Sequence, residues 1–132
     1  AFRSFDAVAR TVLMATPPEQ SLARGIFARD PLPAWTQGRV ALLGDAAHPV
    51  APFLDQATDL ALEDALVLAR AITAAGTGPE ALQRYAAARM PRACALMVAA
   101  EEQGVRLTTL NPDNYMASAA VDPAYDPATG PV

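Results

Sequence analysis

One stretch near the middle of this 132-residue chain constrains its fold more than any other. Arg39 to Leu43 is a short apolar run that ends at Gly44-Asp45, a pattern typical of a strand buried on both faces. A proline-punctuated loop over residues 46–54 follows, and apolar residues then recur at helical spacing from about Gln56 to Ala75. The sequence therefore predicts a strand, a turn and a long helix in succession.

Helical spacing also occurs on both sides of this stretch. Apolar residues from Phe5 to Ala15 follow Ser4, which can cap a helix. Pro79 stands at the first position of another predicted helix, where its missing N–H costs nothing. Pro91 predicts that this helix restarts or kinks before it ends near Leu107.

The remaining segments are expected to be extended. Leu22 to Ala28, within residues 22–29, is a candidate strand that Gly25 weakens. The segment from residue 111 to the last residue holds four prolines and little periodicity. We therefore expect a folded part over residues 1–110 and an extended tail over residues 111–132. The expected fold class is mainly α with one or two strands.

Charge and composition argue against several classes of function. All ten basic residues are arginines, scattered along a chain of net charge −4, so no basic stripe is present for nucleic acid. No apolar run approaches about 18 residues, so neither a membrane span nor a signal peptide is expected. Cys94 is a lone cysteine, which agrees with a reducing compartment, and the expected location is the cytoplasm.

The Gly44-Asp45 turn is suited to a polar cofactor. Gly44 lets the backbone approach a ligand closely, and Asp45 offers two acceptor oxygens to a hydroxyl-rich ligand. The N–H groups at the start of the helix near Gln56 to Asp59 favour negative charge. The alternative is that Gly44-Asp45 is merely a turn and that Asp45 or Asp55 caps a helix.

The full run from Gly38 to Ala65 resembles the second flavin-binding motif of FAD-dependent aromatic hydroxylases, the single-component flavoprotein monooxygenases. In that family a strand and Gly-Asp-Ala-Ala-His-Pro precede a proline, a glycine-glutamine-glycine turn and Ala-Leu-Glu-Asp-Ala. The residues in register with the later part of this pattern are Pro52, Phe53, Leu54, Gln56, Ala61, Leu62, Glu63, Asp64 and Ala65. The flanking residues that also resemble the family are Arg29-Asp30-Pro31, Trp35, Tyr85 and Arg89-Met90-Pro91-Arg92. Tyr125-Asp126-Pro127 resembles the closing segment of the salicylate-hydroxylase-like branch.

The resemblance implies the C-terminal part of the α/β FAD-binding monooxygenase fold. No G-x-G-x-x-G follows a strand, so the Rossmann βαβ unit for the ADP half of FAD is absent from this sequence. The chain is expected to be a fragment or remnant of an FAD- and NAD(P)H-dependent monooxygenase that hydroxylates a small aromatic substrate. Residues 22–29 would be the last strand of the substrate sheet. A homo-oligomer or a complementary N-terminal chain is expected to complete the flavin site.

The resemblance also implies roles for single residues. Asp45 would bind the ribityl hydroxyls of FAD, and the backbone of Pro52, the one catalytic candidate, would lie beside the reactive edge of the isoalloxazine. The amides after Leu54 would face the pyrimidine end of the ring. The cofactor-binding positions implied in this way are Gly44, Asp45, Ala46, Pro52, Leu54, Asp55, Gln56 and Ala57.

Three positions depart from the family pattern. Asp55 and Ala57 replace glycines, and Asp59 replaces an asparagine. Glycine permits a positive φ in such a turn, which aspartate and alanine tolerate worse. The added carboxylates would also face the place where reduced flavin is negatively charged. A non-catalytic helical binding or interaction domain that has lost flavin binding is therefore the alternative, and a different small-molecule site that uses His48 is a third.

The other polar residues of the motif are expected to be structural. A lone histidine beside a turn, as His48 is, more often supports the fold than reacts. Glu63 and Asp64 are predicted to pair with arginines such as Arg70. Asp55, Asp59 and Glu63 share a helical spacing, but we expect a solvated face there and no metal site.

Overall fold

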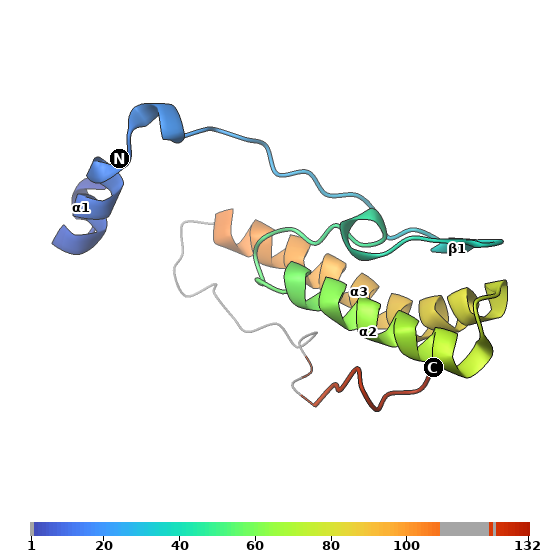
Figure 1. Cartoon of the computed structure of the whole chain (residues 1–132). Helices are drawn as coiled ribbons and strands as arrows, with labels where there is room; N and C mark the ends of the chain where they lie inside the picture. Colours follow the sequence, from blue (N-terminus) through green and yellow to red (C-terminus); the bar gives the residue numbers. More distant parts are fainter. Residues whose placement is uncertain (1, 109–121, 123) are drawn as a thin grey trace.

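A computed structural model describes residues 2–108, 122 and 124–132 of the chain. It is mostly helical with one two-stranded sheet, which confirms the expected fold class at that level (Figure 1). The elements in chain order are a 3-10 turn at Phe2–Ser4, α1 at Ala7–Ala15, a 3-10 turn at Pro18–Gln20, β1 at Thr36–Gln37, β2 at Val40–Ala41, a 3-10 turn at Gly44–Ala46, α2 at Ala57–Ala75 and α3 at Pro79–Thr108.

Helices α2 and α3 form an antiparallel pair that contains most of the core (Figure 1). The α2 helix ends where the N–H of Gly76, at φ 77°, donates to the carbonyl oxygen of Ile72 at 2.8 Å, and Pro79 then opens α3. Small residues at the contact allow the two helices to approach closely. The buried core residues are Trp35, Ala47, Val67, Ala71, Ala81, Tyr85, Ala86 and Ala93.

Pro91 does not interrupt α3, which runs as one helix from Pro79 to Thr108. The predicted restart of the helix at Pro91 is therefore wrong, and the alternative of a kink at Pro91 stays a prediction. An internal proline costs about 3 kcal/mol through one lost hydrogen bond and a steric clash. Arg89 and Ala93 are both fully buried on the two sides of Pro91, so tertiary packing outweighs the local preference.

The predicted strand over residues 39–43 exists as β2, but it is not buried on both faces. It pairs with β1 in an antiparallel hairpin, with Gln37 opposite Val40, and the side chain of Val40 is 64% exposed. One face of the hairpin is attached to α3, because the hydroxyl of Tyr85 donates to the carbonyl oxygen of Leu42 at 3.1 Å. Burial raises the pKa of Tyr85, which keeps this hydroxyl a donor.

The predicted strand over residues 22–29 is irregular in the structure. A strand requires a neighbour with free backbone groups, and no residue among those described pairs with this segment. Leu22, Ile26 and Phe27 are exposed on it. The strand prediction is therefore wrong for this chain as it stands.

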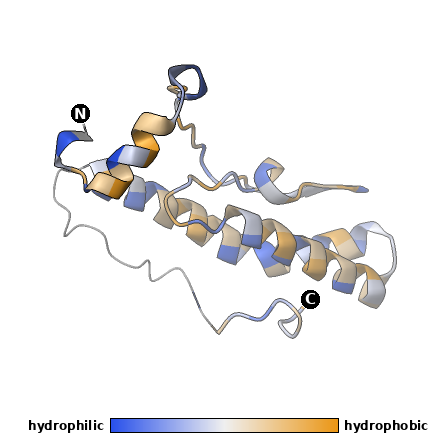
Figure 2. Cartoon of the chain, turned by 60° about the vertical axis from the view of Figure 1, so that its left-hand side comes forward, coloured by the Kyte–Doolittle hydropathy of each residue, from blue (hydrophilic) through white to orange (hydrophobic). Residues whose placement is uncertain are grey.

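The N-terminal helix begins later than predicted. Asp6, not Ser4, caps α1, because its carboxylate accepts hydrogen bonds from the N–H groups of Val8 at 2.7 Å and Ala9 at 3.0 Å. No residue of α1 is buried. Figure 2 shows much of this helix in the colour of hydrophobic residues, so an apolar surface is exposed there.

The predicted extended tail falls partly outside the described residues, which omit 109–121 and 123. Residues 124–132 form turns and irregular structure beside the helix pair (Figure 1). The guanidinium of Arg70 donates to the carbonyl oxygens of Pro127 at 2.7 Å and Gly130 at 2.6 Å. The last part of the chain is therefore attached to α2.

Candidate functional site

The Gly44-Asp45 turn connects the hairpin to the loop before α2. Gly44 is buried at φ 57°, and its carbonyl oxygen accepts the N–H groups of Ala47 and His48, each at 2.8 Å. A Cβ added to Gly44 would lie 3.5 Å from the Cβ of Ala61, an ordinary contact. Glycine is therefore required here by the positive φ and not by lack of space.

Asp45 is exposed, and its carboxylate makes no hydrogen bond or ion pair with any described residue. The Gly44–Ala46 turn has no side-chain cap, and neither does α2. The alternative in which Asp45 or Asp55 is a helix cap is therefore wrong. The structure leaves both oxygens of Asp45 available to a ligand.

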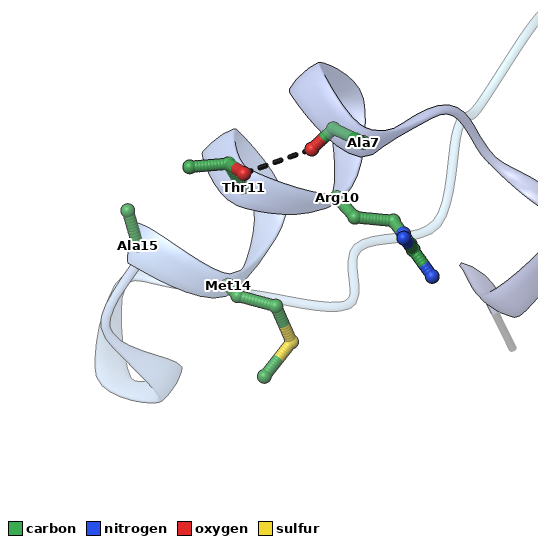
Figure 3. A pocket seen from close by; sticks show the side chains of 5 residues that line it. All are labelled: Ala7, Arg10, Thr11, Met14 and Ala15. Carbon is green, nitrogen blue, oxygen red and sulfur yellow. Dashed lines mark hydrogen bonds between the residues drawn. The ribbon is translucent and has the colours of Figure 1, made fainter.

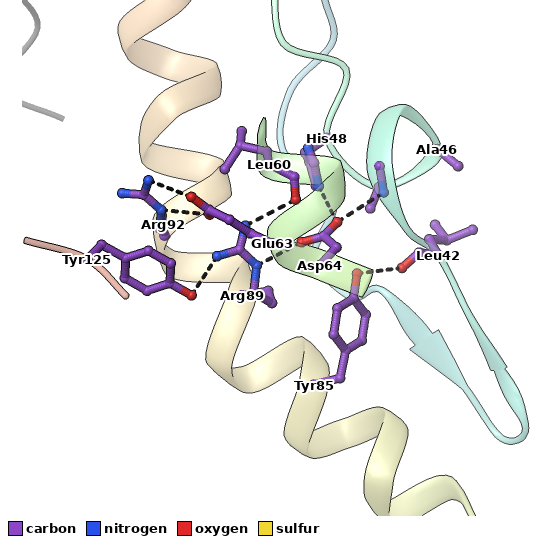
Figure 4. A network of polar contacts seen from close by, with 12 residues as sticks. Leu42, Ala46, His48, Leu60, Glu63, Asp64, Tyr85, Arg89, Arg92 and Tyr125 are labelled. Carbon is purple, nitrogen blue, oxygen red and sulfur yellow. Dashed lines mark hydrogen bonds and ion pairs between the residues drawn. The ribbon is translucent and has the colours of Figure 1, made fainter. Parts of the chain in front are cut away.

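Asp64 of α2 holds the turn from inside (Figure 4). Its Oδ2 accepts the N–H of Gly44 at 3.0 Å and lies 2.6 Å from Nε2 of His48, while its Oδ1 accepts Nε–H of Arg89 at 2.7 Å. Burial alone would raise the pKa of Asp64, but the hydrogen bonds from His48, Arg89 and Gly44 outweigh it and hold that pKa below its ordinary value. The buried carboxylate is therefore ionised and fully bonded.

Glu63 completes a buried ionic cluster with two arginines of α3 (Figure 4). Its carboxylate lies 2.7 Å from Nη2 of Arg89 and accepts two hydrogen bonds from Arg92, each at 2.9 Å. The predicted pairing of Glu63 and Asp64 with arginine is confirmed, but the example of Arg70 is wrong. Arg70 binds tail carbonyls, because antiparallel packing places Arg89 and Arg92 opposite the two acids.

His48 is buried and packs against Trp35, with ring centroids 5.2 Å apart. Because the ionised carboxylate of Asp64 can only accept, Nε2 of His48 carries the proton in that hydrogen bond. Nδ1 is buried with no hydrogen-bond partner among the described residues. These contacts orient the loop after the turn and agree with the structural role expected for His48.

A cavity of about 200 Å³ lies at the start of α2. The residues that line it are Val50, Ala51, Pro52, Asp55, Gln56, Ala57 and Thr58. Four predicted cofactor-binding positions thus meet in one cavity, whereas Gly44, Asp45, Ala46 and Leu54 do not line it. Among the described residues, Asp55 is the non-glycine residue with a positive φ, 52°, so the loop keeps the conformation that glycine would adopt more easily.

Two contacts that the sequence did not predict hold this loop in place. The ring of Phe53 packs on Gly104 of α3, where an added Cβ would lie 2.4 Å from Cε2 of Phe53. Arg29 donates to the carbonyl oxygens of Ala46 at 3.0 Å and Ala47 at 2.9 Å. A glycine inside a helical pattern, as Gly104 is, can indicate close packing and could have pointed to the contact with Phe53. Nothing in the sequence around Arg29 indicates its bonds to the loop.

Another hollow lies on the surface of α1, away from the predicted site residues (Figure 3). Its lining residues all come from that helix: Ala7, Arg10, Thr11, Met14 and Ala15. Within the described part of the chain, no three His, Cys, Asp or Glu residues are placed to hold a metal ion. No described helix is both long and apolar enough to cross a membrane.

Comparison with known proteins matches residues 26–100 to the FAD binding domain. The chain is 41% identical over 92 residues to an aurachin C monooxygenase/isomerase of Stigmatella aurantiaca, covering 70% of this chain and 24% of that protein. It is 42% identical over 93 residues to the 3-amino-4-hydroxybenzoate 2-monooxygenase PtmB3 of Streptomyces platensis, covering 70% of this chain and 23% of that protein. A 6-hydroxynicotinate 3-monooxygenase of Bordetella bronchiseptica is 39% identical over 88 residues, which are 67% of this chain and 21% of that protein.

The fold is also similar to a solved structure. The crystal structure of FqzB superposes with a TM-score of 0.65 and 36% identity, over 70% of this chain and 23% of that one. The chain therefore spans about a quarter of the length of the relatives that it matches. The similarity includes the Gly44-Asp45 turn, the cavity and both long helices, since all lie within or overlap residues 26–100.

Proposed function

Because this chain belongs to the FAD binding domain family, we propose that it forms the flavin-contacting C-terminal part of an FAD-dependent monooxygenase. FAD is the cofactor of that family. Relatives named for the monooxygenation of hydroxybenzoates and hydroxynicotinate support a small aromatic substrate. The complete enzyme would use NAD(P)H as its reductant, as the resemblance implies.

The residues at the turn fit a flavin. Asp45 is an exposed carboxylate with no partner among the described residues, and it is adjacent to the buried Gly44. A cavity with Pro52 on its wall lies at the start of α2, where the first N–H groups of a helix lack partners within the helix. Asp45 supplies acceptors for hydroxyl groups, and the start of α2 supplies donors for a partly negative ring, which are the two kinds of group that this cofactor needs.

When bound, FAD supplies the redox chemistry that activates oxygen. Asp45 would accept hydrogen bonds from the ribityl hydroxyls, and Gly44 and Ala46 would line that contact. The N–H groups of Gln56 and Ala57 would stabilise negative charge on the ring through the positive end of α2. Pro52 would exclude water from one side of the cavity.

The observation that carries this proposal is the contrast between two carboxylates on either side of one glycine. Asp64 is buried and fully bonded, and it fixes the N–H of Gly44. Asp45 is held in place by that anchored turn, yet has nothing to bind among the described residues. Such a carboxylate is free to accept hydrogen bonds from the hydroxyl groups of a ligand. The rest of the flavin site would come from a complementary partner chain or from a second copy of this chain.

The visible absorption spectrum after incubation with excess FAD and desalting tests the proposal. We expect the wild-type chain to retain flavin absorbance and Asp45→Ala to weaken FAD binding by about tenfold or more, since charge-assisted hydrogen bonds are lost. As the control, Glu101→Gln removes an exposed carboxylate from α3 instead of from the turn and should leave FAD binding unchanged. A wild-type protein that stays colourless would contradict flavin binding by this chain.

One observation favours the alternative, a non-catalytic helical binding domain. Asp45, Asp55 and Asp59 are all exposed, and Asp55 lines the cavity, so their like charges would oppose a reduced, negatively charged ring bound there. The same spectrum separates the two functions. Under this alternative the protein is folded by circular dichroism but retains no flavin.

A further inference from the structure

The last described segment of the chain is docked on the helix pair. Arg70 of α2 binds the carbonyl oxygens of Pro127 and Gly130, and Val132 packs against the hydrophobic core. These contacts join residues far apart in the sequence. They hold the segment in one place on the surface of α2 and α3, where it reaches the ionic cluster.

Tyr125 is the residue of this segment that enters the cluster (Figure 4). Its hydroxyl oxygen accepts Nη1–H of Arg89 at 2.7 Å. Its ring lies beneath the guanidinium of Arg92, at 4.2 Å from the ring centroid, and 5.4 Å from that of Arg89. A charge-assisted hydrogen bond and a cation–π contact therefore act together on two arginines of α3.

Arg89 connects Tyr125 to the turn. The guanidinium is fully buried, and its other donors bind Asp64, Glu63 and the carbonyl oxygen of Leu60. A buried arginine that loses one acceptor keeps an unpaired donor, so its guanidinium is driven to rotate toward another partner. A rotation about the Cδ–Nε bond leaves Nε in place but turns its N–H away from Asp64, which is the residue that fixes the N–H of Gly44.

We propose that Tyr125 is a positioning residue for the Gly44-Asp45 turn and acts through Arg89 and Asp64. The hydroxyl of Tyr125 holds the guanidinium, the guanidinium holds one oxygen of Asp64, and the other oxygen holds the turn. The C-terminal segment thereby sets the orientation of Asp45. Its effect on FAD rests on the function proposed above, but the coupling between the two segments does not.

Amide hydrogen exchange on the ¹⁵N-labelled chain without FAD tests the coupling directly. Tyr125→Phe keeps the ring over Arg92 and removes only the hydroxyl. We expect the N–H of Gly44 to exchange about tenfold faster in this variant, since a hydrogen bond to a charged group is lost. Amides in the middle of α2, such as those of Val67 and Ala71, should exchange at the wild-type rate. Thr129→Val removes another hydroxyl from the same segment, one that bonds Asp126, and should change neither rate.

Two outcomes would overturn the coupling. An unchanged exchange rate at Gly44 in Tyr125→Phe would show that the hydroxyl does not act on the turn. Equal acceleration at Gly44, Val67 and Ala71 would show a general loss of stability instead of positioning.

A titration with FAD then separates this inference from the proposed function. If Tyr125→Phe weakens FAD binding while Thr129→Val does not, the coupling reaches the cofactor. If the wild-type chain binds no FAD but Gly44 still responds to Tyr125→Phe, the proposed function fails and the coupling stands.

Discussion

Two carboxylates of one motif have opposite environments. Asp45 is exposed and bonds no other residue in the described part of the chain, whereas Asp64 is buried and bonded to the N–H of Gly44, to His48 and to Arg89. A single glycine with a positive φ brings them to the two sides of the same turn. The first is therefore available for a ligand, and the second determines where the first points.

The buried carboxylate of Asp64 makes the stability of the protein depend on pH in the acidic range. In the unfolded chain the pKa of Asp64 returns to its ordinary value near 3.8, and in the folded protein it is lower. A lowered folded-state pKa means that this stabilisation is complete above about pH 4 and is lost as the pH falls below that value. We therefore expect the free energy of unfolding to decrease on acidification in this range, measured by urea denaturation at several pH values.

Substitution of the same residue checks its contribution. Asp64→Asn removes one of the two carboxylates that bond the buried guanidinium of Arg89, the other being that of Glu63, and should destabilise the protein by about 3 kcal/mol at neutral pH. The decrease in stability below about pH 4 should also become shallower in this variant. Asp59→Asn, an exposed residue of the same helix, is the control. An equal effect of the two substitutions would contradict the role given to Asp64.

Asp55 combines a strained backbone with an added charge. Its φ of 52° costs on the order of 1 kcal/mol for a residue with a side chain, and its exposed carboxylate lies at the cavity. Asp55→Ala removes the charge and keeps the strain, whereas Asp55→Gly removes both. We expect both variants to bind FAD about twofold more tightly, because an exposed like charge is lost, and only Asp55→Gly to relieve the strain. Fluorescence titration measures FAD binding, and thermal denaturation measures the stability gained from relief of the strain. If only Asp55→Gly bound FAD more tightly, the backbone and not the charge would be the cause.

At the scale of elements, the loop and α3 meet at one close contact. An added Cβ at Gly104 would overlap the ring of Phe53, at 2.4 Å from Cε2. Replacement of a helical glycine by alanine otherwise gains about 1 kcal/mol. In Phe53→Ala, which vacates this space, Gly104→Ala should therefore stabilise the protein by about that amount. In the wild-type background the gain should be absent, because the ring must move and the cavity beside it changes shape.

A double-mutant cycle in chemical denaturation measures this coupling. Gly78→Ala is the control, since an added Cβ there meets nothing within 4 Å. Equal effects of Gly104→Ala in both backgrounds would contradict the contact with Phe53.

The elements differ in how far local sequence could predict them. The α2 and α3 helices follow from apolar periodicity, with Gly76 and Pro79 between them, and β2 lies at the start of the predicted apolar run. The continuity of α3 through Pro91 depends on packing between the two helices, which cannot be predicted from the local sequence. The segment 22–29 has the composition of a strand but no neighbour among the described residues to bond.

The candidate site divides in the same way. The sequence was enough to select Gly44 and Asp45 as a turn and as candidate site residues, because both the turn after a strand and the resemblance to a family depend on consecutive residues. The partners of Glu63 and Asp64 could not, since Arg89 and Arg92 lie 25 to 29 positions later and meet them only through antiparallel packing. Arg70, which is near in sequence, instead binds the tail.

At the scale of the whole molecule, many large apolar side chains are exposed. Val8 and Met14 on α1 are 75% and 84% exposed, and Phe27 is 88% exposed. Leu62 and Leu66 add an apolar strip on the outer face of α2. A surface of this kind is stabilised when another surface covers it.

We therefore expect the purified chain to associate with itself at micromolar concentration. Light scattering coupled to size exclusion should give a mass above the 13.8 kDa of one chain, and the mass should decrease on dilution. Phe27→Ser should shift the equilibrium toward the monomer, because it removes one of the most exposed apolar side chains. Gln83→Ser, at an exposed polar position of α3, should have no effect. A wild-type chain that stays monomeric at these concentrations would show that its apolar surface does not bind a second copy, and a complementary segment of the flavin domain would then be the partner to test.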